Sequence, residues 1–156
     1  DWIEIFNAEN FAVDIGGMFV TDDLSEPDKW QIPDSDPNQT TIPAGGFLIL
    51  WFDGDPDQGV LHVDTKLSAG GEDVGLFALD GTQIDALSFG PQTANISYGR
   101  VPDGGTIFQF FDTPTPGLSN SSSSGGDAAA PPTSLEESGF YNNPLGVTLS
   151  TTTAGL

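Results

Sequence analysis

The sequence predicts an all-β sandwich, and three observations lead to that prediction. No stretch keeps the apolar period of a helix, because 20 glycines and 12 prolines interrupt every candidate. Runs rich in β-branched and aromatic residues recur instead, at spacings of about 8–15 residues, as in antiparallel sandwiches. Turn sequences rich in Gly, Asp and Pro separate these runs, such as PAGG at 43–46 and PDGG at 102–105.

The predicted strands are short, and two features of them bear on their arrangement. FLILWF, residues 47–52, is apolar on both faces, so we expect it at the centre of a sheet. Asp80-Gly81 is typical of a tight hairpin turn between the runs on either side of it. The strands are expected at residues 2–6, 11–15, 17–21, 29–32, 47–52, 60–64, 74–79, 83–89, 96–100, 107–111 and 146–153.

Composition changes abruptly towards the end of the chain. Pro114 and Pro116 cannot donate to a β-ladder, so the sandwich is expected to comprise residues 1–118. Residues 119–133 are rich in Ser, Gly, Ala and Pro and read as a linker. Strand character returns only in residues 134–156, which are long enough for the first strand or two of a second β module.

Charge and cysteine content exclude several classes of function. The chain has 23 acidic against 3 basic residues and a net charge of −20, so it should repel nucleic acid and anionic membranes. It has no cysteine, which excludes a disulfide scaffold and thiolate metal sites. No apolar run approaches the roughly 20 residues of a membrane span, so no membrane insertion is expected. Such an acidic surface suits a salty extracellular setting or serves solubility alone.

A series of short motifs resembles one known family. DWIEIFN, VDIGG, KWQIP, IPAGGFLILW, DGD, LH, KLSAGGEDVGLFALDGTQID, FGPQ, SYGR, PDGG and PTPG follow one another between residues 1 and 120. In this order they resemble the bacterial lamin-tail domain, which implies an immunoglobulin-like β-sandwich. Two departures stand out. The family usually opens with one more strand before DWIE, and GGMFVTDD stands where it often has an aromatic residue after a single Gly.

The end of the chain resembles a second family. SGFYNNPLGVTLSTTTAGL is similar to the opening of the small immunoglobulin-like modules at the C-terminus of chitobiases and β-hexosaminidases. Together the two resemblances imply a piece of a larger, multidomain bacterial protein that is secreted or displayed on the cell surface.

The acidic loop DGDPDQG, with a near echo in DSDPNQT at 34–40, raises the question of calcium. An EF-hand needs Gly at its sixth position and a Glu at its twelfth, but here Gln58 and an Asp stand there, and no helices flank the loop. Two alternatives remain: a polar loop chosen for turn geometry, or a looser calcium site. The ligands of such a site would be Asp53, Asp55, Asp57 and Asp64.

Other single residues have competing interpretations. His62 is the only histidine, either a packed structural residue or a catalytic base, but no nucleophile motif such as GxSxG accompanies it. Arg100, the only arginine, is expected to form a bidentate pair with an acid, and if that pair is buried its loss should cost about 3–5 kcal/mol. Trp2, Trp30 and Trp51 either fill the core or stack on sugars, and no feature of the sequence selects one.

These observations predict a non-catalytic interaction or spacer module without a cofactor, apart from loose calcium. Its expected partners are other protein domains or copies of itself, and we expect assembly by β-strand addition, with residues 146–153 as a candidate donor strand. The alternatives are a calcium- or carbohydrate-binding module and an accessory domain of a secreted hydrolase.

Overall fold

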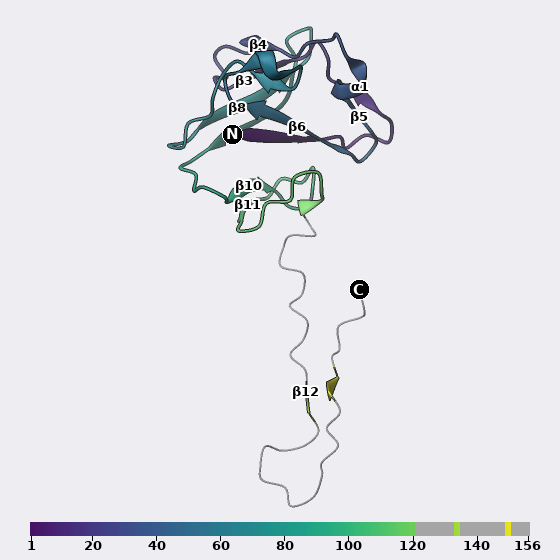
Figure 1. Cartoon of the computed structure of the whole chain (residues 1–156), viewed down its shortest axis with the longest axis vertical. Helices are drawn as coiled ribbons and strands as arrows, with labels where there is room; N and C mark the ends of the chain where they lie inside the picture. The colour runs from purple at the N-terminus through teal and green to yellow at the C-terminus, as the bar shows by residue number, and fades with distance from the viewer. Residues whose placement is uncertain (121–132, 135–148, 151–156) are drawn as a thin grey trace, which may run out of the picture. The chain divides into compact units, whose positions relative to one another are not determined.

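The computed structural model describes residues 1–120, 133–134 and 149–150, and it confirms the predicted all-β class (Figure 1). The strands form several sheets, and helix is confined to two single turns in the described residues. The chain divides into two compact units, Asp1–Ser123 and Ser124–Leu156.

Eleven strands and two short helices make up the described part of the first unit. They are β1 (Trp2–Phe6), β2 (Val13–Asp14), β3 (Phe19–Thr21), β4 (Trp30–Gln31), α1 (Pro37–Thr40), β5 (Thr41–Ile42), β6 (Phe47–Phe52), η1 (Pro56–Gln58), β7 (His62–Val63), β8 (Glu72–Phe77), β9 (Gln83–Phe89), β10 (Ser97–Arg100) and β11 (Phe108–Phe111).

Two sheets carry most of this unit, in the orders β1-β6-β7 and β4-β3-β8-β9. β6 lies between β1 and β7, as its two-faced apolar pattern predicts. β1, the purple strand at the N-terminus in Figure 1, runs antiparallel beside β6. β8 and β9 form the hairpin that Asp80-Gly81 predicts, and Gly81 has the positive φ of +82° that such a turn needs. The pairs β2–β5 and β10–β11 complete the arrangement.

The structure departs from the predicted strands mainly in their length. The runs at 11–15 and 60–64 contribute only two paired residues each, and β5, α1 and η1 were not expected. In the second unit, β12 (Thr133–Ser134) pairs antiparallel with β13 (Leu149–Ser150). The rest of the predicted strand at 146–153, and residues 121–132 of the predicted linker, lie outside the described residues.

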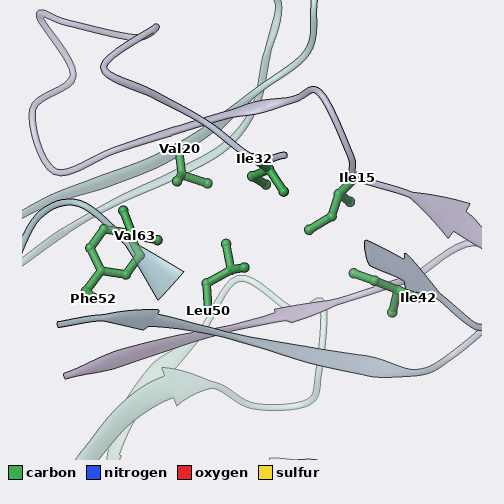
Figure 2. Close-up of a cluster of buried hydrophobic side chains, with 7 residues drawn as sticks. All are labelled: Ile15, Val20, Ile32, Ile42, Leu50, Phe52 and Val63. Carbon is green, nitrogen blue, oxygen red and sulfur yellow. The ribbon is translucent and has the colours of Figure 1, made fainter. Parts of the chain in front are cut away.

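One apolar cluster fills the interior of the first unit. Figure 2 shows its seven side chains, which come from segments far apart in the chain and point into a shared space. Alternate residues of β1 and β8, such as Ile3 and Val74, pack against this cluster from its edges, as the two-residue period of a strand requires. The seven are Ile15, Val20, Ile32, Ile42, Leu50, Phe52 and Val63.

A buried amide fixes the end of β1 to this core. The Asn7 side chain is 6% exposed, and its Nδ2 donates to the carbonyl oxygens of Phe11 at 2.9 Å, Ile42 at 2.9 Å and Pro43 at 3.0 Å. Its Oδ1 accepts the backbone N–H of Glu9 at 3.0 Å. Both the nitrogen and the oxygen of the amide therefore have hydrogen-bond partners, so burying Asn7 leaves neither of them unpaired.

The core position of Leu50 leads to a prediction. Leu50 is fully buried, whereas Leu79 is 68% exposed. Leu50→Ala should therefore lower the free energy of unfolding by about 2–5 kcal/mol, through lost transfer energy and a residual cavity. The matched control Leu79→Ala should change it by no more than about 0.5 kcal/mol. Equal losses in chemical denaturation would contradict this assignment of the core.

Candidate functional site

The two acidic motifs lie at the starts of short helical turns, and in the first of them the Asp side chain also caps a backbone N–H. In both, an Asp-Pro pair opens a short helix: Pro37 begins α1 and Pro56 begins η1. The Asp before each Pro receives a hydrogen bond from the Gln three residues later, at 2.6 Å for Gln39 and 2.9 Å for Gln58. Proline suits the first helical position, because its missing N–H has no partner there in any case. The sequence DPxQ could have signalled these turns.

In the first motif the cap has an electrostatic consequence. The Asp36 carboxylate accepts from the Gln39 side chain and from the Asn38 backbone N–H at 3.2 Å. The Gln39 bond is the main cause that lowers the pKa of Asp36, against a desolvation that raises it. The charged form of Asp36 is therefore the one that stabilises this turn.

In the second motif, Asp53 pairs with the single histidine. Its Oδ2 lies 2.7 Å from Nδ1 of His62, and its Oδ1 accepts the N–H of Asp55 at 3.1 Å. Desolvation raises the pKa of Asp53, but the bonds from His62 and Asp55 outweigh it, so the pKa is lowered. The stabilisation is therefore present above the unfolded pKa and is lost as the pH falls through the folded one. Through this contact His62 ties β7 to the loop.

The structure does not gather the four predicted calcium ligands into one site. Asp53 is engaged with His62, and Asp55 with Gln58. Across the described ranges, no group of three or more His, Cys, Asp or Glu side chains is placed so that it could hold a metal ion. The hydrogen bonds of Asp53 and Asp55 are those of a polar turn.

The tryptophans differ in exposure. Trp51, on β6, is 41% exposed, whereas Trp2 and Trp30 are half-buried. The Trp51 ring lies beside the His62 imidazole, with centroids 6.4 Å apart and planes 20° from parallel. Trp51 is thus the ring most accessible to a sugar, but it lines neither of the cavities of 430 and 810 Å³.

Arg100 forms the predicted bidentate pair, with Asp85 of β9. Its Nη2 lies 2.7 and 2.9 Å from the two carboxylate oxygens, and Nη1 donates to the carbonyl of Gly105 at 2.8 Å. Its guanidinium carbon sits 4.4 Å from the centre of the Phe108 ring. The Asp85 side chain is 60% exposed, so the pair is not buried, and the cost of about 3–5 kcal/mol expected of a buried pair does not apply here.

β1 has a free edge, and the phase of its ladder identifies the free groups. Phe52 N–H donates to Asp1 C=O at 3.0 Å, and Asn7 N–H donates to Gly46 C=O at 2.9 Å. In an antiparallel pair, residues alternate between facing the partner strand and facing away. Within the described residues, three of β1 therefore direct their N–H and C=O away from β6, towards no other strand: Trp2, Glu4 and Phe6.

This edge opens on the larger cavity of about 810 Å³. We name it the β1 groove, and its volume lies within the range of about 300–1,000 Å³ typical of binding sites. Apolar side chains of both sheets line it, together with part of the β10–β11 hairpin. They include Ile3, Ile5, Val74, Leu76 and Leu87.

Glu4 is the acidic residue on β1 itself. It is half-buried, and its Oε1 accepts the N–H of Gly117 at 2.6 Å. Desolvation raises the pKa of Glu4, the Gly117 bond opposes this, and the charge of Asp103 raises it further. None of the ion pairs in the described residues includes Glu4. The β1 groove therefore holds a carboxylate without a cationic partner.

Comparisons of this chain with protein-family models, with curated proteins and with solved structures found no match. Among the described residues, no helix has the length and apolar character to cross a membrane.

Calcium titration gives a direct check on the acidic loop. Because Asp53 and Asp55 already accept hydrogen bonds, we expect calorimetry to detect no micromolar site. Asp28→Ala, in another loop, is the control for the general effect of removing one charge. A micromolar site that Asp55→Ala abolishes and Asp28→Ala preserves would contradict this expectation.

For Arg100 we expect a moderate effect on stability. Arg100→Ala should lower the free energy of unfolding by about 1–2 kcal/mol, because it removes an exposed ion pair and a cation–π contact. Asp85→Ala removes only the ion pair and should cost no more than about 1 kcal/mol. Thermal or urea unfolding measures both, and a loss above about 3 kcal/mol for either variant would contradict the exposed pair.

Proposed function

We propose that this chain is a non-catalytic interaction module of a secreted or cell-surface bacterial protein. In this proposal residues 1–118 are an immunoglobulin-like sandwich of the lamin-tail type, residues 119–133 a linker, and residues 134–156 the start of a chitobiase-type module. The ordered motifs support the family, and the all-β fold is compatible with it. The fold alone would not indicate the function, since sandwiches serve many.

One observation carries the interaction role: among the described residues no strand pairs with the outer edge of β1, which opens on a groove lined by apolar side chains. An exposed edge is a template for another strand, and proteins usually cover, charge or shorten such edges. Adding a strand there would satisfy the free N–H and C=O groups of β1 and cover part of the apolar lining. β-Strand addition to an exposed edge is a recurrent mode of peptide recognition.

The proposed role needs no catalytic group. The imidazole of His62 is bonded to Asp53, and in the described part of the chain no hydroxyl is hydrogen-bonded to its ring. A nucleophile activated by this histidine would need such a contact. Its position instead serves the β6–β7 pair, in which Trp51 stands opposite His62.

Hydrogen exchange tests the edge directly. In the full chain, we expect the amides of Trp2, Glu4 and Phe6 to exchange rapidly and those of Ile3 and Ile5 slowly, since only the latter donate to β6. A capped neutral peptide, Ser-Val-Ile-Thr-Ile-Val-Ser, should protect the first three on binding. Protection equal to that of Ile3 before any peptide is added would show that the edge is already covered.

A matched pair of variants isolates the edge donor. Glu4→Pro removes an N–H that points away from β6, so the β1–β6 ladder stays intact. Glu4→Ala loses the same carboxylate but keeps the N–H. Peptide binding should be lost in the proline variant and kept in the alanine variant. Equal binding by the two would refute strand addition at β1.

A further inference from the structure

The outer face of β6 carries the most exposed of the three tryptophans. Trp51 is 41% exposed, whereas its neighbours in the strand, Leu50 and Phe52, are fully buried. Successive side chains of a strand point to opposite faces of the sheet, so the Trp51 ring projects away from the core. Because β6 is the middle strand of β1-β6-β7, this ring presents its surface to solvent in the interior of the sheet.

The exposure of Trp51 does not depend on the edge of β1. A further strand paired with that edge would lie two strand spacings, about 10 Å, from β6. Trp51 itself stands between two paired strands, opposite Trp2 of β1 and His62 of β7. No strand can therefore be added at Trp51, and a ligand can reach only the side chains of this face.

Polar side chains stand beside the ring on the same face. The His62 ring lies next to that of Trp51, with centroids 6.4 Å apart and planes 20° from parallel. Asp53 follows about 7 Å further along the strand, and its Oδ2 lies 2.7 Å from Nδ1 of His62. Lys66 stands opposite Asp53 in an isolated antiparallel bridge, so the two side chains share a face. These four side chains lie within the span of a short oligosaccharide.

These polar groups keep hydrogen-bonding capacity for a ligand. The ionised carboxylate of Asp53 can only accept, so Nδ1 of His62 donates to it. Nε2 of the neutral imidazole is then an acceptor, and in the described part of the chain no side chain bonds to it. Lys66 is exposed and takes part in none of the ion pairs of the described residues. The indole N–H of Trp51 adds a further donor.

A flat ring flanked by an acceptor and a donor suits a carbohydrate. When all hydroxyls of a pyranose are equatorial, its C–H face packs on the π face of an indole, whose quadrupole is negative. Its hydroxyls both donate and accept, which matches the imidazole and the ammonium group. The net charge of −20 disfavours an anionic sugar. Since Trp51 lines neither cavity, the ligand would lie along the surface, as an extended glycan does.

We propose that Trp51, His62 and Lys66 form a surface site for a neutral glycan whose β-linked rings carry equatorial hydroxyls, as in a β-1,4-glucan. One ring of the glycan stacks on the indole, and its hydroxyls bond Nε2 of His62 and Nζ of Lys66. Asp53 is a positioning residue that orients the imidazole. This binding function is additional to the proposed strand addition, from which the site is separate.

Cellohexaose tests the site on the full chain. In an NMR titration we expect it to shift the indole N–H signal of Trp51 and the amides of β7, with a Kd of about 1 mM. Trp51→Ala should weaken binding at least about tenfold, as the β7 amides report. Phe110→Ala removes an exposed ring of β11 and should leave binding unchanged. Equal losses in the two variants would show general attraction to exposed rings and overturn the site.

A matched glycan and a lysine variant test the recognition of hydroxyls. The hexamer of β-1,4-linked glucuronic acid keeps the linkage and the C–H faces but adds a carboxylate to each ring. We expect it to bind at least about tenfold more weakly than cellohexaose. Lys66→Gln should weaken cellohexaose binding by about two- to tenfold, the value of one hydrogen bond. Equal binding of the two glycans would overturn the preference for a neutral sugar.

The remaining outcomes separate this site from strand addition. If cellohexaose at about 10 mM moves neither the indole signal nor the amides of β7, the glycan site is refuted. If a capped Gly-Lys-Gly-Lys-Gly peptide moves them instead, the occupant of this face is a cation and the glycan is again refuted. Neither result changes the comparison of Glu4→Pro with Glu4→Ala, which tests strand addition alone.

Discussion

The antiparallel ladder between β1 and β6 is the constraint on which the rest of the unit depends. Its register places Ile3 and Leu50 opposite each other and turns both towards the core. The same register directs the peptide groups of Glu4 away from β6, because residues of an antiparallel pair alternate in direction. Slippage by one residue would exchange the two faces. The buried amide of Asn7 stabilises the end of this ladder, so the core and the free edge follow from one pairing.

Local pattern was sufficient to predict much of this fold. The bounds of β1, β6 and β9 match their predicted runs, and Asp80-Gly81 gave the hairpin, because alternation and turn preference act over a few residues. The two-residue strand β5 carries no such pattern. Nor could Asp85 be selected from 23 acids as the partner of Arg100, since that contact depends on how separate hairpins meet. The free edge of β1 is likewise a property of sheet order.

The acidic residues of this chain have a local structural use. Five aspartates accept the backbone N–H of the residue two positions later: Asp14, Asp23, Asp36, Asp53 and Asp80. This is the geometry by which Asp mimics a backbone turn. Two of the five, Asp36 and Asp53, belong to the acidic motifs whose spacing resembles that of a cation-binding loop. A high acid content here reflects the number of turns as well as the character of the surface.

These capped turns bear on how the protein behaves in acid. The pKa of each of the five aspartates is lowered, since hydrogen bonds favour its charged form. Their contribution to stability is therefore lost only below the pKa of an unfolded Asp, about 3.9. The isoelectric point is near 4.1, where net repulsion between molecules vanishes. These turns should thus keep their hydrogen bonds at a pH where the molecule carries little net charge and charge repulsion no longer opposes association.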